Sequence, residues 1–170
     1  MIILSLGSNL NSSYGDKFSN LEFAITFLQS YGILVNKKSS FYQTPSYPDK
    51  TNPKFINLII SVKTHLPPLD LMSVLTFIEE KLERKRNKKN DPRTCDIDII
   101  DYNNEIHDFT YKNLEIIIPH KNLCFRNFVL IPLHEIVPEW KHPKTKETVT
   151  SLIEKLSEED RKSILKVTKN

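Results

Sequence analysis

The chain has 170 residues, of which 39% are hydrophobic and 26% charged, and its formal net charge at pH 7 is +3. This length and composition are typical of one globular domain with a core of its own. So small a net charge does not require a polyanionic partner, and no apolar run has the length of a transmembrane helix. We therefore expect a single domain over residues 1–170, a monomer that binds neither nucleic acid nor a membrane.

The two cysteines, Cys95 and Cys124, form neither a CxxC pair nor a disulfide framework. Such sparse cysteine usage is typical of reduced thiols in the cytoplasm. The apolar start from Ile2 to Leu6 lacks the basic region of a signal peptide and turns polar at Gly7-Ser8-Asn9. We expect a cytoplasmic protein whose first element is a buried strand.

Hydrophobic periodicity predicts the elements that follow. A helix is expected from Asp16 to Tyr31, where apolar residues recur at helical spacing and a glycine follows. A strand is expected from Ile33 to Tyr42, and the proline-broken stretch 45–53 is expected to be a surface loop near a site. The next strand runs from Phe55 to Lys63, and its alternate residues should face opposite sides of a sheet.

Asn57 is an amide in the middle of that apolar strand. One explanation is a structural hydrogen bond from the amide to a neighbouring loop. The other is an amide that recognises a polar heterocycle stacked near Phe55. Spacing alone leaves both explanations open.

Pro67-Pro68 begins a long helix that is expected to reach about Arg86. Glu80 and Arg84 stand four residues apart near its end, so an exposed ion pair would account for Arg84. The basic run nevertheless continues past the helix to Arg93. A loop that closes over phosphates explains this continuation, and a plain solvated loop is the alternative.

Two aspartates, Asp96 and Asp98, follow the basic run in a β-branched segment. Residues i and i+2 of a strand share a face, so the two carboxylates should project side by side while Ile97 and Ile99 pack the other way. Adjacent carboxylates repel each other, and a divalent cation relieves that repulsion. Mg²⁺ is commonly held by one or two carboxylates plus substrate phosphates, which arginine also binds. The pattern leaves two explanations open: a metal–phosphate site, and a polar strand end beside a solvated basic loop.

The last third of the chain adds further elements to the pattern. A turn is expected at Asn103-Asn104, where a hairpin would form, and an apolar strand over Leu114 to Ile118 leads to His120 and Arg126. An amphipathic helix and a last short strand are expected between 148 and 170. The order strand–helix–strand–strand–helix–strand predicts an α+β, ferredoxin-like fold, an antiparallel sheet with helices packed on it.

Taken together, these motifs resemble the 6-hydroxymethyl-7,8-dihydropterin pyrophosphokinases, ATP-dependent enzymes of folate biosynthesis. The resemblance covers about residues 1–138, and its most specific part is the segment 92–100. The segments that carry it are Gly7-Ser8-Asn9-Leu10, 40–45, 92–100, and Pro119-His120 with 126–133.

The resemblance implies that the diphosphate of ATP is transferred to the hydroxymethyl group of the pterin and that AMP is released. It implies that Asp96 and Asp98 hold two Mg²⁺ ions, and that Arg84 and Arg86 complete the catalytic set. The ATP-binding positions that it implies are Glu79, Arg84, Arg86, Arg93, Ile99, His120 and Arg126. The pterin-binding positions that it implies are Thr44, Pro45, Phe55, Asn57 and Phe128.

Five positions depart from the family pattern, and they bear on loop closure and affinity more than on the type of reaction. They are Thr76, Glu83, Asn90, Asp91 and Lys121. Two other functions stay open at this stage. One is an RNA-binding module that uses the cations between Lys81 and Arg93, although two aspartates on its strand would repel RNA. The other is a degenerate relative that binds pterin or nucleotide without turnover.

Overall fold

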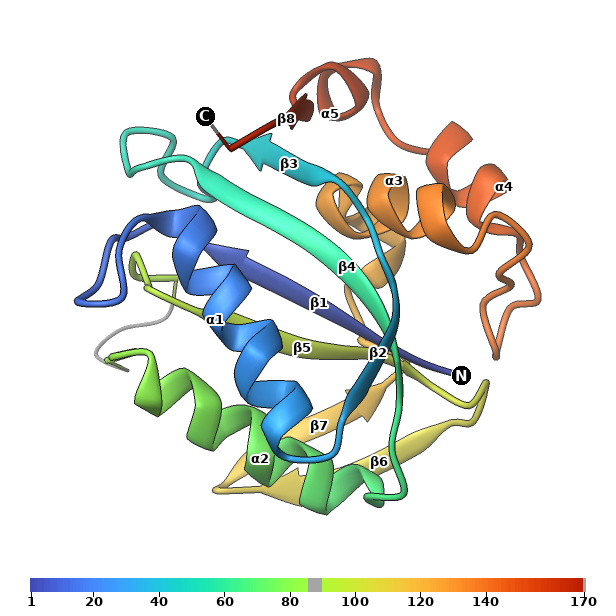
Figure 1. The fold of residues 1–170 in the computed structure, drawn as a ribbon. Coiled ribbons are helices and arrows are strands. Elements are labelled where there is room, and N and C mark those ends of the chain that lie inside the picture. Colours follow the sequence, from blue (N-terminus) through green and yellow to red (C-terminus); the bar gives the residue numbers. More distant parts are fainter. Residues whose placement is uncertain (86–89, 170) are drawn as a thin grey trace.

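The computed structural model describes residues 1–85 and 90–169 (Figure 1). Within these ranges, helices pack on an antiparallel sheet in an α+β fold, which confirms the predicted fold class. In chain order the elements are β1 (Ile2–Ser8), α1 (Lys17–Ser30), β2 (Leu34–Lys38), β3 (Phe41–Thr44), β4 (Phe55–Lys63), α2 (Pro68–Lys81), β5 (Asp96–Tyr102), β6 (His107–Tyr111), β7 (Leu114–Ile118), the 3₁₀ turn η1 (Leu123–Phe125), α3 (Asn127–Ile136), α4 (Val149–Glu154), α5 (Glu158–Lys162) and β8 (Leu165–Val167).

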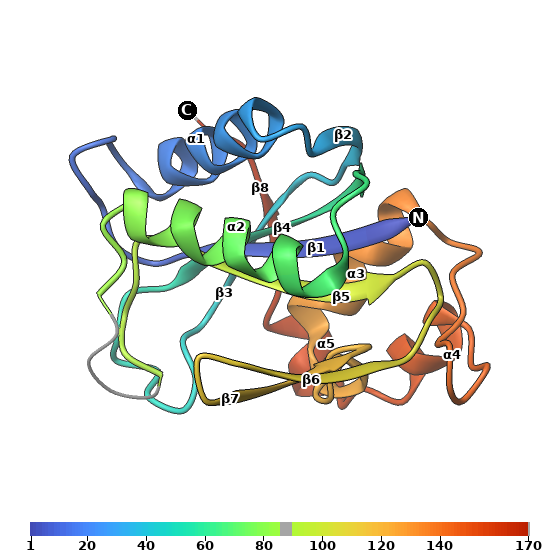
Figure 2. The same cartoon turned by 90° about the horizontal axis from the view of Figure 1, so that it is seen from below.

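The main sheet has the strand order β5-β1-β4-β3-β8, and β2 also pairs with β4. All of these pairings are antiparallel. Strands β6 and β7 form a separate hairpin that lies beside α2 and the end of β5 (Figures 1 and 2). β1 therefore lies between β4 and β5, and its side chains are neighbours of both.

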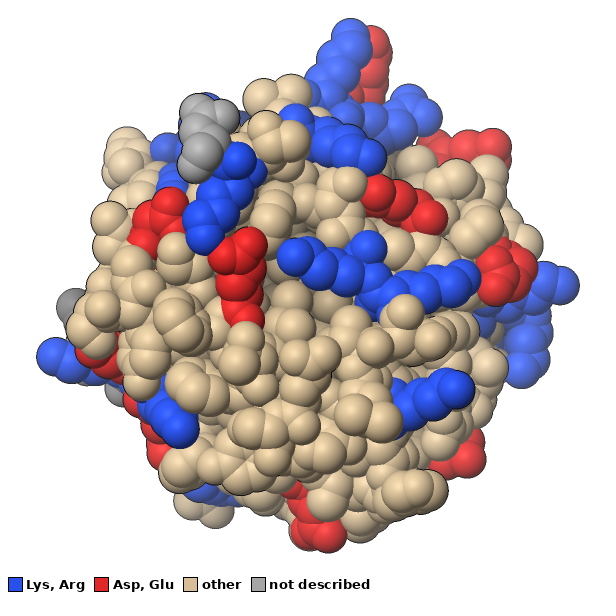
Figure 3. Space-filling model, viewed as in Figure 1, with Lys and Arg blue, Asp and Glu red and all other residues tan. Residues whose placement is uncertain are grey.

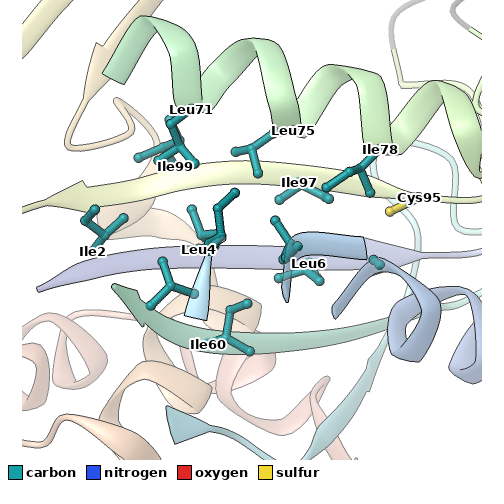
Figure 4. Close-up of a cluster of buried hydrophobic side chains, with 14 of the residues drawn as sticks. Ile2, Leu4, Leu6, Ile60, Leu71, Leu75, Ile78, Cys95, Ile97 and Ile99 are labelled. Carbon is teal, nitrogen blue, oxygen red and sulfur yellow. The ribbon is translucent and has the colours of Figure 1, made fainter. Parts of the chain in front are cut away.

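Helices α1 and α2 cover one face of the sheet, and α3 with α4 covers part of the other (Figure 2). Even-numbered residues of β1 and β4 pack under α1 and α2, as Leu4, Leu6 and Ile60 show in Figure 4. Ile3 and Ile59 point to the opposite face and pack against α3. This confirms the alternation predicted for β4, since each strand contributes to two separate cores.

The outer surface over α1 and α2 carries few charges (Figure 3). Exposed aromatic side chains lie on these two helices and just after α1, among them Phe23, Tyr31 and Phe77. Among the described residues, no helix has the length and apolar character needed to cross a bilayer.

Helix α2 ends at Lys81, several residues before the predicted end at Arg86. Glu83 takes a left-handed conformation with φ of 66°, its N–H donates to the carbonyl of Glu80, and the Arg84 N–H donates to the carbonyl of Glu79 at 3.0 Å. These are the hydrogen bonds of a Schellman motif, which satisfies the last carbonyls of a helix and turns the chain away from its axis. The predicted helix is thus too long because Arg84 already lies outside it.

The strand predicted from Ile33 to Tyr42 is divided into β2 and β3. At the break, the hydroxyl of Ser39 accepts the N–H of Ile59 at 3.0 Å, in place of a backbone carbonyl. The two halves pair with successive parts of β4.

Two further expectations are met only in part. The predicted turn at Asn103-Asn104 is present and is closed by an antiparallel bridge between Tyr102 and Glu105, but the pairing extends no further, because β6 pairs with β7. The C-terminal region contains two short helices and the expected strand, β8, rather than one helix. Ser157 begins the second helix by accepting the N–H of Asp160.

Candidate active site

Asn57, Gly7 and Asp96 form one row across three neighbouring strands. Gly7 of β1 is paired with Asn57 of β4 on one side and with Asp96 of β5 on the other. None of the three belongs to the hydrophobic cluster that Ile3 and Ile59 form with α3. Since Gly7 has no side chain, the row is hollow at its centre: a Cβ atom there would lie 3.1 Å from Asn57 Oδ1 and 3.6 Å from the Phe55 ring.

Asp96 and Asp98 lie on the same face, as predicted, while Ile97 and Ile99 pack in the core under α1 and α2. Both oxygens of Asp96 accept guanidinium N–H groups: Arg84 Nη1 donates to Oδ1 at 2.6 Å, and Arg93 Nε donates to Oδ2 at 2.8 Å. Burial raises the pKa of Asp96, but the charges of Arg93 and Arg84 outweigh it and hold the pKa below its ordinary value.

Arg84 has two anionic partners, Asp96 and Glu79. Glu79 is 1% exposed, and its Oε1 also accepts the N–H of Ile97 at 2.8 Å, which fastens α2 to β5. The ion pair expected between Glu80 and Arg84 is therefore wrong: Glu80 instead pairs with Lys112 at 3.3 Å. Arg84 belongs to the site because the Schellman turn directs it back over β5.

Asp98 is more open than Asp96. Arg126 Nη1 donates to its Oδ2 at 3.2 Å, and the Arg126 guanidinium lies 5.5 Å from the Phe128 ring centre. The backbone N–H of His120 donates to the carbonyl of Ile100 at 3.2 Å, which brings this histidine to β5. Burial lowers the pKa of His120 despite the opposing charge of Asp98, so its imidazole is neutral at pH 7.

Three of the predicted pterin positions, Asn57, Thr44 and Phe55, lie together at the other end of the row. Asn57 Nδ2 donates to Thr44 Oγ1 at 3.0 Å and to the carbonyl of Tyr42 at 3.4 Å. The amide thus has a structural partner, on strand β3 rather than in a loop, and its oxygen faces Gly7. Phe55 is the register partner of Thr44, and its ring centre lies 5.0 Å from the Arg93 guanidinium.

The remaining site residues lie nearby, on the opposite face, or outside the described ranges. Pro45 directly follows Thr44, and Phe128 lies on α3. Ile99 is buried on the face opposite Asp98, so a contact with nucleotide would have to use its backbone. Arg86 lies outside the described residues.

Asn9 belongs to the site, although only its place in the Gly7-Ser8-Asn9-Leu10 motif pointed to it in the sequence. It is 2% exposed, and its Oδ1 accepts the N–H of Arg93 at 2.7 Å. Its Nδ2 donates to the carbonyl of Pro53 at 3.0 Å and to Ser46 Oγ at 3.3 Å. One side chain therefore joins the segment that follows β1, the loop before β4 and the segment that carries Arg93.

The departures from the family pattern lie mainly around the same segments. Glu83 accepts hydrogen bonds from the N–H and hydroxyl of Ser13, which joins the end of α2 to the loop before α1. Asn90, like Glu83, has φ of 66°, and the carbonyl of Asp91 accepts from Arg93 Nη1 at 3.1 Å. Thr76 is buried in α2, and Lys121 pairs with Glu115 at 3.7 Å.

The donor set fits Mg²⁺ bound together with a phosphate ligand. In the part of the chain that the structure describes, no three acidic, histidine or cysteine side chains come together as a metal cage. Mg²⁺ does not need one, since it retains water and takes substrate phosphates in addition to one or two carboxylates. Asp96 and Asp98 offer that pair of carboxylates on one face.

A site of two carboxylates, three guanidiniums and an amide-lined hollow is suited to binding phosphate groups, directly and through a divalent cation. The family model described as 7,8-dihydro-6-hydroxymethylpterin-pyrophosphokinase matches residues 3–138. The chain belongs to this family, and the predicted family, enzyme class and role in folate biosynthesis are confirmed. Members of the family use ATP.

Curated relatives include proteins named 2-amino-4-hydroxy-6-hydroxymethyldihydropteridine pyrophosphokinase. That of Synechocystis is 35% identical over 155 residues, which cover 91% of this chain and 75% of the relative. That of Bacillus subtilis is 34% identical over 134 residues, which cover 78% of this chain and 75% of the relative.

Similar solved structures include wild-type Plasmodium falciparum HPPK-DHPS, with a TM-score of 0.71 and 19% identity over 91% of this chain. This likeness shows the fold alone. The present chain spans 44% of that longer chain, and 20% of the folic acid synthesis protein fol1 of Schizosaccharomyces pombe, to which it is 33% identical.

Proposed function

We propose that the row of Asn57, Gly7 and Asp96 lines the substrate-binding site in which the family's reaction takes place. The strand register carries this proposal, because it sets an amide and a carboxylate two strands apart on one face with only a glycine between them. Amides and aromatic faces recognise a heterocycle, whereas cations and metal-binding carboxylates recognise phosphates. The pterin then lies towards Asn57, and the ATP phosphates lie towards Asp96.

The pterin pocket in this proposal consists of Thr44, Pro45, Phe55, Asn57 and Phe128. Phe55 and Phe128 each have a flat guanidinium over the ring, at 5.0 Å and 5.5 Å, which supports a role in packing against a flat ligand. The oxygen of Asn57 faces the hollow over Gly7 and accepts hydrogen bonds from the amino and ring N–H groups of a pterin.

The phosphate side of the site uses Arg84, Arg93 and Arg126, which already surround the two carboxylates. The hydroxymethyl oxygen attacks the β-phosphorus and loses its proton to solvent, the bond from this phosphorus to the oxygen bridging the α and β groups breaks, and AMP leaves with that oxygen. The arginines position the phosphates and stabilise the developing charge. Glu79, Arg86, Ile99 and His120 complete the proposed ATP set.

Asp96 and Asp98 would hold the two Mg²⁺ ions of this proposal. When bound, Mg²⁺ neutralises phosphate charge and orients the reacting groups for in-line displacement. The placement of the two carboxylates on one face of β5 supports the assignment, because Mg²⁺ is commonly held by one or two carboxylates plus substrate phosphates.

Three broader features belong to the same proposal: a single domain over residues 1–170, a monomer, and a cytoplasmic location. The shared sheet beneath both cores supports the single domain. The free thiols of Cys95 and Cys124 support a reducing compartment. The RNA-binding alternative is disfavoured because the β5 face that would stack bases carries two aspartates.

The deciding experiment follows nucleotide products from ATP, Mg²⁺ and 6-hydroxymethyl-7,8-dihydropterin. We expect AMP, formed only when pterin is present, and a loss of at least about a hundredfold in its rate on Asp98→Asn substitution. ADP in place of AMP would contradict the proposed transfer. Binding of both substrates without AMP would indicate the degenerate relative, and unchanged turnover in Asp98→Asn would remove the metal assignment.

A further inference from the structure

Both oxygens of Asp96 accept hydrogen bonds from guanidinium groups. Oδ1 accepts from Arg84 at 2.6 Å, and Oδ2 accepts from Arg93 Nε at 2.8 Å. Asp98 has one such bond, the 3.2 Å contact from Arg126, and its side chain is 34% exposed against 20% for Asp96. The two proposed metal ligands are therefore unequal: a cation approaching Asp98 meets a more open carboxylate, and one approaching Asp96 must displace a guanidinium.

Of the two guanidiniums bound to Asp96, that of Arg84 can leave and still keep an anionic partner. Its side chain is 13% exposed, and it binds Glu79 as well as Asp96, so it keeps one anionic partner on leaving the other. Arg93 differs, because its backbone N–H and C=O are fixed by hydrogen bonds with Asn9 and its guanidinium lies over Phe55. Displacement of Arg84 leaves that arrangement in place.

We propose that Arg84 acts as the counter-ion of Asp96 in the substrate-free protein and competes with divalent metal for this carboxylate. A metal ion alone must replace a guanidinium within hydrogen-bonding distance and overcome its repulsion. A nucleotide removes this obstacle, since its phosphates offer Arg84 a new bidentate partner. Metal and nucleotide then bind cooperatively at Asp96. This inference rests on the proposed function, because it takes Asp96 as a metal ligand.

The test measures binding of Mn²⁺, as a paramagnetic substitute for Mg²⁺, to the ligand-free chain by electron paramagnetic resonance. We expect Arg84→Gln to bind Mn²⁺ about tenfold or more tightly than the unsubstituted chain, since an arginine beside a carboxylate shifts its equilibria by that order. Lys85→Gln is the matched control: it removes the same charge from the adjacent, exposed residue, and we expect a change of less than about twofold.

A second readout concerns cooperativity. In the unsubstituted chain, a non-hydrolysable ATP analogue should tighten Mn²⁺ binding by more than it does in Arg84→Gln, because the variant has no guanidinium to displace. Arg84→Lys retains a cation and should keep Mn²⁺ binding weak. Equal effects of Arg84→Gln and Lys85→Gln would overturn the inference, since they would show a general charge effect.

Two more variants separate the ways in which the experiment can fail. If Arg84→Gln does not fold, Glu79→Gln/Arg84→Gln removes one charge of each sign and keeps the net charge of the pair; it too should bind Mn²⁺ more tightly. Asp96→Asn added to Arg84→Gln should abolish the gain. If it does not, Asp96 is not a ligand and the metal assignment of the proposed function fails. If Asp96 is required but Arg84→Gln binds Mn²⁺ like the unsubstituted chain, only the competition is wrong.

Discussion

At the scale of single residues, Gly7 sets the shape of the candidate site. A methyl group at this position would enter the space between Asn57 Oδ1, 3.1 Å away, and the Phe55 ring, 3.6 Å away. The backbone of β1 needs no unusual conformation there, since Gly7 lies within a regular antiparallel register. The requirement for glycine is therefore one of space over the sheet.

We predict that Gly7→Ala raises the KM for pterin about tenfold and leaves the KM for ATP nearly unchanged. The free energy of unfolding should change by less than about 1 kcal/mol, because neighbouring atoms need to move only slightly. Steady-state kinetics with each substrate varied in turn measure this, with Ser5→Ala, on the same face of β1, as a control without added volume. An unchanged KM for pterin would place the pterin elsewhere.

At the scale of loops and elements, Asn9 links three segments whose relative positions the site depends on. Its oxygen accepts the Arg93 N–H, and its amide donates to Pro53 and Ser46. Removing the acceptor leaves a backbone N–H without its partner, which costs about 1–3 kcal/mol where the group is buried.

We predict that Asn9→Ala speeds hydrogen exchange at the Arg93 amide and lowers kcat about tenfold through the displaced guanidinium. Asn9→Asp distinguishes the acceptor role of the side chain from its donor role, because it retains the acceptor for the Arg93 N–H but loses the donor to the Pro53 carbonyl. Amide exchange at Arg93 should be slow in Asn9→Asp and fast in Asn9→Ala. Similar exchange in both variants would contradict the role given to the side-chain oxygen.

Glu135 fastens helix α3 to strand β3. Its carboxylate accepts the N–H and the hydroxyl of Ser40 at 3.1 Å and 2.7 Å, and the hydroxyl of Tyr42 at 2.8 Å. Burial acts to raise the pKa of Glu135, but the hydrogen bonds from Ser40 and Tyr42 outweigh it and hold the pKa below its ordinary 4.5. The same burial and contact raise the pKa of Tyr42 to about 12.

A lowered pKa in the folded state means that the ionised Glu135 stabilises the fold above pH 4.5, and that this contribution is lost as pH falls through the lowered value. We predict that Glu135→Gln lowers the free energy of unfolding by about 1–3 kcal/mol at pH 7, and that the difference shrinks towards pH 3. Denaturant unfolding at both pH values measures it. A difference that is the same at both would show that the charge is not involved.

The elements that could be predicted are those with strong local signals. The alternation in β4 and the shared face of Asp96 and Asp98 follow from the period of a strand alone. The end of α2 could not be predicted, because Glu83 takes a left-handed conformation that favours glycine. The contacts of Asn9 were missed for another reason: they join residues up to 84 positions apart, and nothing local indicates them.

At the scale of the whole molecule, the two hydrophobic cores share one sheet. Leu58 and Ile59 are neighbours in β4, both fully buried, yet Leu58 packs under α1 and α2 and Ile59 packs against α3. The site row lies on the face of Ile59, while the strands that carry it are held by both cores. Loss of packing in either core should therefore disturb the strands that position the site residues.

We predict that Leu58→Ala and Ile59→Ala each lower stability by about 2–5 kcal/mol, the usual result of removing a buried aliphatic side chain. Each should retain a single cooperative transition, because neither core can lose its packing without disturbing the strand that the other needs. Thermal unfolding followed by far-UV circular dichroism and by Trp140 fluorescence measures this, since Trp140 reports on the α3 side. Coincident transitions by both probes would support one domain. If Leu58→Ala separated them, the α3 side would fold on its own and the single-domain proposal would be wrong.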